Sequence, residues 1–286
     1  WWLILNGPIL TFRPSKSGKA YKKVWDNENY GSPLRKFTIY QSKKLSDILS
    51  LDKNIIVDYA MRYGVPAMHK TLDNMMKQGC TKVLLVPLYP QYAASTTATV
   101  KDEFFRWMLK QRWQPALRTI APWFDDDNYI NALAKTVKDN FKNDKKPDML
   151  IISFHGIPKR YFAAGDPYHC HCIKTARLLK EKLKWPDEKI LVTFQSRFGP
   201  EPWLQPYTDK TIIDLAKNGT KSIAVVAPGF ISDCLETLEE INVEARELFI
   251  ENGGKEFNYI PCLNDNEHSI KFLEGIIKKN LQGWVS

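Results

Sequence analysis

The sequence has few cysteines, no long apolar run and no block of like charge. Its 286 residues include five cysteines, Cys80, Cys170, Cys172, Cys234 and Cys262, which form no recognisable disulfide framework, so we expect a reducing compartment. No apolar run reaches the roughly 20 residues that span a bilayer, and no signal peptide is visible. We therefore expect neither a disulfide scaffold nor a membrane-spanning protein.

The composition is that of a soluble globular protein. The chain is 44% hydrophobic and 26% charged, and it carries a net charge of +9. A basic chain favours acidic partners such as nucleic acid, an anionic membrane surface or a carboxylated ligand. Because its lysines and arginines are scattered along the sequence, this indication is weak, and we expect no nucleic-acid partner.

Strand-like and helix-like segments alternate from residue 54 onward. The expected strands are 55–57, 83–88, 116–120, 149–154, 190–194, 223–227 and 259–260, with helices near 67–79, 97–111, 126–142, 168–184, 206–217, 235–252 and 267–281. This alternation predicts an α/β fold with parallel sheets. We expect two Rossmann-like halves, 1–125 and 126–286, with the last helix packing back on the first half. The first half lacks an opening strand, because about fifty residues precede its first convincing strand.

One predicted strand ends at a histidine. Residues 149–154 are apolar and rich in β-branched side chains, and His155, Gly156 and Pro158 follow them within a few residues. In open α/β sheets, ligands bind outside the carboxyl ends of the strands. His155 therefore lies where this fold places its chemistry, although a histidine that merely ends a strand would look the same.

A row of glutamates follows another strand. Ser232 and Asp233 are expected to cap the helix near 235–252. Glu236, Glu240 and Glu244 then lie four residues apart on one stripe of that helix, a spacing at which like charges repel. A π-bulge would bring them into closer register, and such bulges are frequent at functional sites. A solvated acidic face is the alternative, but the row begins at the carboxyl end of a strand and could face the same crevice as His155.

Aromatic residues follow the carboxyl ends of several strands. Trp203, in the loop 193–204, offers a flat surface to a planar ligand, and Tyr89 and Trp123 end equivalent strands of the first half. Arg197, in the same loop as Trp203, could hold a carboxylate of a ligand or of its own chain. The pattern predicts a cleft for something large, flat and apolar. For any one of these residues, covering the sheet edge is the alternative.

The run His169-Cys170-His171-Cys172 alternates metal-ligating side chains at the start of a predicted helix. Structural metal sites more often space their ligands as C-x₂₋₄-C with a second pair elsewhere, and no clear partner pair exists here. Alternate residues at a helix start also point in different directions. We therefore expect no metal site and no iron–sulfur cluster.

The beginning of the chain is apolar and then basic. Residues 1–12 are apolar and aromatic, and Arg13, Lys16, Lys22 and Lys23 are among the basic residues that follow. Tryptophan next to basic residues is typical of an interfacial segment. We expect residues 1–23 to form a lip that covers a ligand or contacts a membrane, with a core helix as the alternative.

Together these stretches closely resemble the ferrochelatase family over essentially the whole chain. The matching motifs are Met61-Arg62-Tyr63-Gly64, Tyr89-Pro90-Gln91-Tyr92, Ser153-Phe154-His155-Gly156-Ile157-Pro158, Gly165-Asp166-Pro167-Tyr168, Phe194-Gln195-Ser196-Arg197-Phe198-Gly199 and Asp233-Cys234-Leu235-Glu236-Thr237-Leu238-Glu239-Glu240. The resemblance implies two Rossmann-like halves around a porphyrin cleft. It also implies insertion of Fe(II) into a porphyrin, release of two protons, and no required cofactor.

The resemblance assigns roles by position. His155 and Glu236 match the catalytic histidine and the acid that faces it, and with Glu240 and Glu244 they form the set that handles the metal. The matched porphyrin contacts are Arg13, Tyr89, Trp203, Phe230, Ile4 and Leu5. The matched residues on the metal side of the pocket are Arg62, Tyr89 and Trp123.

The sequence departs from the family in three places. The opening strand and its Asn-x-Gly-Thr-Pro loop are absent, and Cys234 stands where animal members carry histidine. The C-terminal cysteine trio of cluster-binding members is also missing, and Ala94 occupies the matching upstream cysteine position. Some bacterial members carry cysteines near Cys170 and Cys172.

We expect the chain to insert ferrous iron into protoporphyrin IX, with neutral His155 accepting a proton and Glu236 assisting. Coproporphyrin III is the alternative substrate. A cobalt or nickel chelatase for a more carboxylated tetrapyrrole, and a non-catalytic porphyrin- or haem-binding protein, are the rival functions. We expect a cytoplasmic protein in peripheral contact with the inner membrane through its lip, or an organellar matrix protein if the source is eukaryotic; a homodimer is left open.

Overall fold

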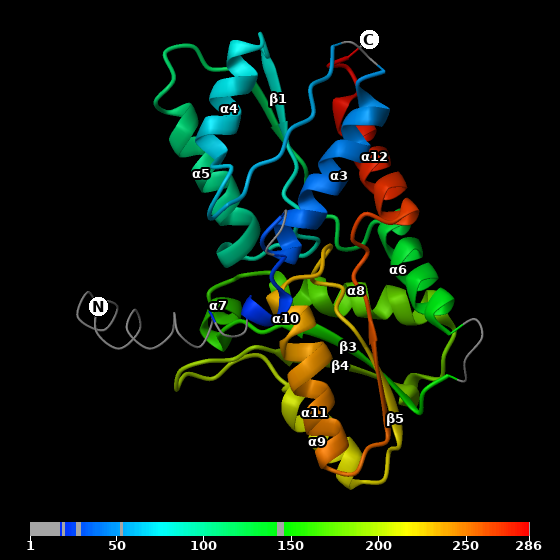
Figure 1. The fold of residues 1–286 in the computed structure, drawn as a ribbon. Helices are drawn as coiled ribbons and strands as arrows, with labels where there is room; N and C mark the ends of the chain where they lie inside the picture. Colours follow the sequence, from blue (N-terminus) through cyan, green and yellow to red (C-terminus); the bar gives the residue numbers. More distant parts are fainter. Residues whose placement is uncertain (1–17, 19–20, 27–29, 52–53, 142–145, 286) are drawn as a thin grey trace.

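The computed structural model describes residues 18, 21–26, 30–51, 54–141 and 146–285. Two parallel sheets lie in two lobes (Figure 1). The first sheet pairs β1 (Lys82–Leu85) with β2 (Ala116–Thr119). The second has the order β4-β3-β5-β6, formed by β3 (Met149–His155), β4 (Ile190–Gln195), β5 (Ser222–Val226) and β6 (Glu256–Ile260). The predicted α/β fold with parallel sheets in two halves is confirmed.

Helices follow the strands in the predicted order. They are α3 (Pro33–Leu49), α4 (Met68–Lys77), the π-helix η2 (Ala94–Ala98), α5 (Thr99–Met108), α6 (Asp127–Asn140), α7 (Lys159–Ala163), α8 (Tyr168–Leu183), the 3₁₀-helix η3 (Asp187–Lys189), α9 (Thr208–Lys217), α10 (Leu235–Leu238), the π-helix η4 (Glu240–Ala245), α11 (Arg246–Glu251) and α12 (Glu267–Leu281). The sequence reading missed α3 and α7. A signal for α3 was present, because the Ser32 hydroxyl accepts from the Arg35 N–H and Pro33 opens the helix.

The two halves repeat one order of elements. β1 begins at Lys82 and β5 at Ser222, 140 residues later, and the same offset separates α4 from α9, β2 from β6 and α6 from α12. The chain enters α4 and α9 in the same way: the Met61 N–H donates to the Pro66 carbonyl, as the Phe194 N–H donates to that of Pro206. Arg62 of the first half therefore takes the place that Gln195 takes in the second.

The strand expected at residues 55–57 is wrong. In the second half, β4 pairs with β3, the first strand of that half. The segment of the first half that corresponds to β4, which contains residues 55–57, has no neighbouring strand among the described residues. There, β1 pairs with β2 alone. A strand is held by hydrogen bonds to a neighbour, so this segment runs without a ladder while Ile55 and Val57 pack on the core.

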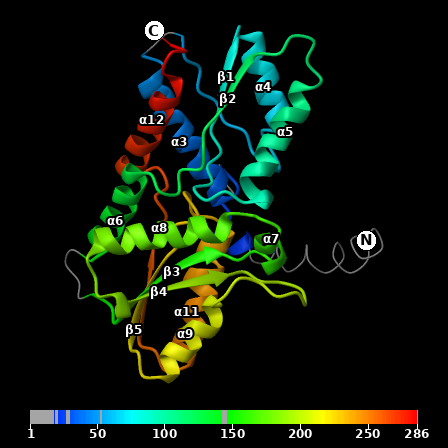
Figure 2. The ribbon, with the colours of Figure 1, turned by 180° about the vertical axis from the view of Figure 1, so that it is seen from behind.

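In the 140-residue repeat, α6 ends the first set of elements and α12 ends the second, and each packs on elements of the other set. α6 lies against α8, and α12 lies against α3 and α6 (Figures 1 and 2). Beyond α12, the Trp284 carbonyl accepts from Lys82 Nζ, and the Arg118 guanidinium stacks on the Trp284 ring at 4.3 Å. One hydrophobic core runs through these helices and β3, so the two lobes share a single interior.

The strands of both sheets end towards the waist between the lobes (Figure 1). This is the region where open α/β sheets bind ligands. Among the described residues, no helix combines the length and hydrophobicity needed to cross a bilayer.

Candidate active site

His155 is the last residue of β3 and is half-buried. Its Nδ1 lies 2.7 Å from the Gly156 carbonyl oxygen. Because a carbonyl oxygen only accepts hydrogen bonds, Nδ1 carries the proton of the neutral ring and Nε2 keeps its lone pair. The Tyr168 hydroxyl donates to the His155 carbonyl at 3.0 Å and fixes the backbone. The imidazole is thus held in the tautomer that can accept a proton at Nε2.

The predicted row of glutamates lies on a helix that changes its winding. Glu236 is in α10, and Glu240 opens the π-helix η4. The Glu239 carbonyl accepts from both the Val243 N–H at 3.2 Å and the Glu244 N–H at 2.9 Å, which marks the change of register. The wider turn brings residues four apart closer to alignment. Glu236 and Glu240 are half-buried and Glu244 is exposed, so the row leads from the interior to solvent.

Electrostatics tie His155 to this row. Burial raises the pKa of the Glu240 carboxyl, and the neighbouring Glu236 charge raises it further. The Ser196 hydroxyl, which donates to Glu240, and the His155 ring both act in the opposite direction. The imidazole at the end of β3 therefore lies within electrostatic reach of the carboxylates that follow β5.

The first half contributes to the same site. Burial raises the pKa of the Tyr89 phenol, and Tyr63 and the charge of Glu236 raise it further, while Arg62 opposes them. Arg62 is itself anchored from behind by Glu103 of α5, at 3.7 Å. Tyr89 thus lies within electrostatic reach of Glu236 from the other half, and Arg62 lies near Tyr89.

Two aromatic residues adjoin His155. The Phe230 ring lies 6.4 Å from the imidazole, nearly edge-on. Trp203 is 5% exposed and covers Gly156, and its indole N–H donates to the Phe198 carbonyl at 3.0 Å. Phe230 is only partly buried and Trp203 is largely covered by its own loop, so contact of either ring with a macrocycle stays a prediction.

Trp123 lies in the core. It is 3% exposed and packs on Tyr129 and Phe272, with ring centroids 5.0 and 4.9 Å away. Its indole N–H donates to the Pro87 carbonyl at 3.3 Å. These contacts give Trp123 a role in core packing. Its place on the metal side of a pocket stays a prediction.

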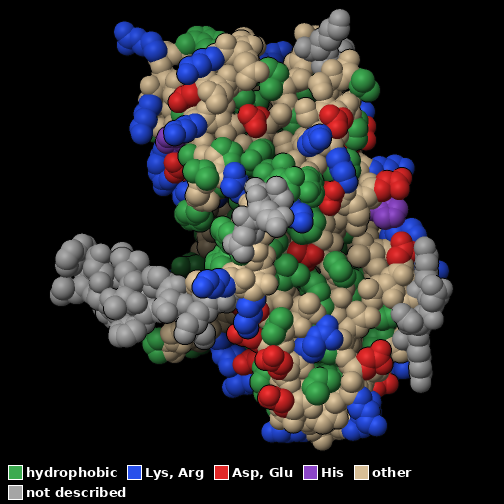
Figure 3. Space-filling model, viewed as in Figure 1, with side chains coloured by type: hydrophobic (Ala, Val, Ile, Leu, Met, Phe, Trp, Pro, Cys, Tyr) green, Lys and Arg blue, Asp and Glu red, His purple; other side chains and the backbone are tan. Residues whose placement is uncertain are grey.

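A cavity of about 750 Å³ opens beside the site. Its described lining includes the aromatic side chains of Tyr21, Trp25, Tyr30 and Tyr63 and the cationic side chains of Lys22 and Arg35. Burial and the charge of Glu236 raise the pKa of the Tyr21 phenol, so this part of the lining lies within electrostatic reach of Glu236. In Figure 3, hydrophobic side chains gather at the waist between the lobes.

The last residues of the lip, 21–23, are held against the helical segment that carries the row of glutamates. Lys23, in the helical residues 21–24, forms an ion pair with Glu239, whose side chain is only 4% exposed. Ile4, Leu5 and Arg13, for which porphyrin contacts were predicted, lie outside the described residues.

The expected helix caps at Ser232 and Asp233 are wrong. Cys234 is the N-cap of α10, and its N–H donates to the Thr237 hydroxyl at 3.0 Å. Asp233 is instead a buried acceptor that ties the start of α10 to the loop after β6. Its carboxylate accepts from the Tyr259 hydroxyl and, at 2.7 Å, from Asn264 Nδ2. Such a long-range partner leaves no local mark in the sequence.

Two further contacts of the second half were missed. Gln195 Nε2 donates to the Glu236 carbonyl at 2.9 Å, and the Ser196 hydroxyl donates to the Glu240 carboxylate. Both residues lie in the loop that the sequence singled out for its aromatic side chains. Arg197, in the same loop, is occupied by its own chain and holds Asp209 bidentately at 2.7 and 2.9 Å.

The histidine and cysteine run at the start of α8 is dispersed. Cys170 is exposed and Cys172 is buried, so their thiols point in different directions. The His169 ring stacks on Phe194 and the His171 ring on Phe124. Among the residues that the structure describes, no three His, Cys, Asp or Glu side chains converge as a bound metal ion requires.

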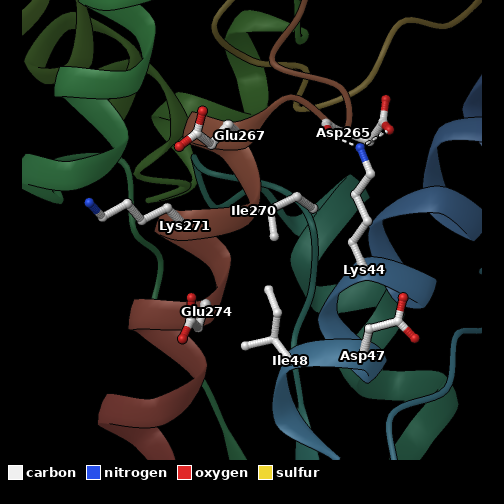
Figure 4. A pocket seen from close by; sticks show the side chains of 8 residues that line it. All are labelled: Lys44, Asp47, Ile48, Asp265, Glu267, Ile270, Lys271 and Glu274. Atoms are coloured by element: carbon white, nitrogen blue, oxygen red, sulfur yellow. Dashed lines mark hydrogen bonds and ion pairs between the residues drawn. The ribbon is translucent and has the colours of Figure 1, made fainter.

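A second hollow, of about 570 Å³, lies between α3 and α12 (Figure 4). Ile48 and Ile270 face each other within it, and charged side chains of both signs surround them. Lys44 and Asp265 already form an ion pair there. None of its lining residues belongs to the site around His155. Its mixed charges are typical of a contact between helices of the two halves.

Comparison with known proteins gives one consistent result. The family model described as Ferrochelatase matches residues 1–281. The chain is similar to proteins named ferrochelatase from Allorhizobium ampelinum, 56% identical, and Agrobacterium fabrum, 54% identical. Both matches cover 100% of this chain and 83% of the relative. A third, from Brucella ovis, is 49% identical and covers 100% of this chain and 81% of the relative.

Solved structures show the same fold at low sequence identity. SirB from Bacillus subtilis with Fe³⁺ has a TM-score of 0.61 at 16% identity, covering 88% of this chain and 92% of SirB. CbiX, described as the terminal enzyme for biosynthesis of sirohaem in denitrifying bacteria, has a TM-score of 0.55 at 12% identity. That match covers 87% of this chain and 94% of CbiX. These likenesses place the chain in the chelatase fold.

Proposed function

This chain belongs to the ferrochelatase family, a family of lyases that insert ferrous iron into a porphyrin at the last step of haem synthesis, and we propose that its substrate is protoporphyrin IX. We further propose that the porphyrin lies in the cleft between the two lobes, with His155 on one side and Glu236 on the other. The observation that carries this proposal is the contact between His155 Nδ1 and the Gly156 carbonyl, which leaves Nε2 as the ring nitrogen that can accept a proton.

The reaction replaces two pyrrole N–H protons by one ferrous ion. In the proposal, His155 Nε2 accepts one proton as the first nitrogen binds iron, and Glu236 accepts the second. Pyrrole N–H groups are very weak acids, so the ring must also be bent to expose its nitrogens. Binding energy from the flat faces of the macrocycle can supply that distortion.

The acidic row supports a path for the metal substrate. Glu236 and Glu240 are half-buried and Glu244 is exposed, so a hydrated ion would meet Glu244 first. Hard carboxylates bind divalent iron weakly enough to release it. The porphyrin nitrogens would then supply the coordination that the described side chains do not offer by themselves.

The aromatic cavity beside the site favours protoporphyrin IX over coproporphyrin III. Protoporphyrin IX has two propionates and two vinyl groups, whereas coproporphyrin III has four propionates. The described lining offers two cations, Lys22 and Arg35, among aromatic side chains. Arg35 Nε is buried without a hydrogen-bond partner among the described residues, as a donor awaiting a carboxylate would be.

A direct comparison of substrates tests this choice. Anaerobic iron insertion is measured with protoporphyrin IX, coproporphyrin III and sirohydrochlorin at matched concentrations. We expect kcat/KM to be at least roughly tenfold higher for protoporphyrin IX. A preference for coproporphyrin III would overturn the substrate, and tight porphyrin binding without metal insertion would overturn the activity.

We propose in addition that the lip contacts an anionic membrane surface on the cytoplasmic side. Tyr21 of the lip and Trp25 just beyond it are exposed, and Lys22 lies between them in the chain, a composition suited to the bilayer interface. Co-sedimentation with vesicles that contain phosphatidylglycerol should be lost in Trp25→Ala and should fall at high salt. Equal binding to neutral vesicles, or none at all, would contradict the proposal.

A further inference from the structure

The end of β4 connects the histidine to the acidic row. Gln195, the last residue of β4, is the ladder partner of His155. Its carbonyl accepts from the Gly156 N–H at 2.7 Å. β3 and β4 therefore stay paired up to His155 and Gln195. Ser196 follows directly after this pair.

The Gln195 side chain fixes the backbone of the acidic helix. It is 7% exposed, and its Nε2 donates to the Glu236 carbonyl at 2.9 Å. Its Oε1 accepts from the Ser153 hydroxyl at 2.7 Å, so the amide itself cannot turn freely. The start of α10 is thus tied to β4 by a contact that does not involve any carboxylate.

Ser196 then reaches the carboxylate of Glu240. Its backbone lies in the left-handed region with φ of 64°, a conformation uncommon for a residue other than glycine. In that conformation its hydroxyl donates to Glu240 Oε2. Hydrogen bonds to charged acceptors are among the stronger ones in proteins. One oxygen of Glu240 is therefore occupied, and no hydrogen bond to the other is seen among the described residues.

We propose that Ser196 is a positioning residue, whose hydroxyl holds Glu240 in the orientation that receives the ferrous ion. This inference rests on the proposed role of the acidic row. Because Gln195 holds the backbone of α10 independently, removal of the Ser196 hydroxyl releases the Glu240 carboxylate and leaves the helix in place. Iron capture should weaken while porphyrin binding is unchanged.

Two substitutions separate the hydroxyl from the backbone strain. Ser196→Ala and Ser196→Gly both remove the hydroxyl, but alanine keeps the backbone strain that serine bears in the left-handed region, whereas glycine relieves it. Thr211→Val is the matched control, because among the described residues the Thr211 hydroxyl bonds to the carbonyl of Tyr207, the N-cap of α9, and not to the acidic row. Thermal unfolding of each variant confirms that the protein compared is folded.

The readout is the split between the two substrates in anaerobic steady-state kinetics. We expect both Ser196 variants to raise KM for ferrous iron roughly three- to tenfold, with KM for porphyrin within about twofold of wild type. Thr211→Val should change neither value. An effect in Ser196→Ala that is absent in Ser196→Gly would attribute it to strain and overturn the proposal.

Glu240→Gln distinguishes the inference from the function on which it rests. If Glu240→Gln raises KM for iron but the Ser196 variants do not, Ser196 has no positioning role and the acidic row keeps its function. If Glu240→Gln leaves KM for iron unchanged, the row does not handle iron, and the proposed path and this inference both fail.

Discussion

Gly156 determines how closely the ends of β3 and β4 approach each other. A Cβ atom at this position would lie 2.9 Å from the Gln195 carbonyl oxygen and 3.1 Å from the Trp203 ring. The first contact is with backbone, which cannot move aside without losing the hydrogen bond from the Gly156 N–H. Glycine is therefore required here because the backbone beside His155 is closely packed.

Gly156→Ala should lower both stability and activity. We expect a loss of about 1–3 kcal/mol in the free energy of unfolding, typical of an overpacked site, and a reduced kcat because His155 is adjacent. Urea unfolding and iron insertion measure the two effects. Gly275→Ala in α12 is the control, since no atom lies within 4 Å of its added Cβ and the helix should gain stability. Equal stability of the two variants would contradict this account.

Single residues of the site were predictable only where they follow a strand. His155 and the three glutamates stand at or just beyond carboxyl strand ends, and the topology rule for open sheets points to such positions. Asp233, Gln195 and Ser196 owe their roles to partners 26 to 44 residues away in the chain. No local pattern records such pairings, so the sequence could not assign them.

At the scale of elements, α8 is linked to the loop that follows β1. The His171 Nδ1 accepts from the Tyr92 N–H at 3.2 Å, and its ring stacks on Phe124 with centroids 3.7 Å apart. Burial lowers the pKa of His171, against the opposing charges of Asp125 and Asp166. The fold therefore favours the neutral ring, the form in which Nδ1 can accept.

This shift predicts a pH dependence of stability. As pH falls through 6.5, the unfolded chain binds a proton at His171 before the folded chain does, so stability is lost below that pH. His171→Asn keeps an acceptor oxygen near the Nδ1 position and cannot titrate. Wild type should therefore lose more free energy of unfolding than His171→Asn between about pH 7.5 and 5.5. Parallel curves for the two proteins would show that the shift is absent.

Helices and strands could be predicted from the sequence where their apolar residues follow a clear helical or strand-like pattern. The strands β3 to β6 and the long helices have clear apolar patterns and were found within a few residues. Residues 55–57 look like a strand, but the strand pairing that would make them one is missing among the described residues. The π-helix η4 was anticipated as a π-bulge that would bring Glu236, Glu240 and Glu244 into closer register.

At the scale of the whole molecule, the exchange of final helices joins the two lobes. α6 and α12, which end the two repeated sets of elements, each pack on the other set, and the Phe272 ring of α12 contacts both Trp123 and Tyr129. The sequence gives the repeated order of elements but does not encode this exchange locally. A cleft between two sheets keeps its width only if the lobes cannot move independently, and the shared core supplies that constraint.

Phe272→Ala tests this coupling. The side chain is 2% exposed, so its removal should cost about 3–5 kcal/mol. Because the core is shared, both lobes should still unfold in one transition, at a lower temperature. Far-ultraviolet circular dichroism and tryptophan fluorescence should give coincident melting curves. Two separate transitions would mean that the lobes are independent units.

The central claim is that His155 and Glu236 exchange protons with a porphyrin held between them. The most direct measurement is the single-turnover rate of ferrous iron insertion into bound protoporphyrin IX, compared between wild type, His155→Ala and Glu236→Gln. We predict that each variant binds the porphyrin with about wild-type affinity and loses at least roughly 100-fold in rate. Near-wild-type insertion by His155→Ala would contradict the account.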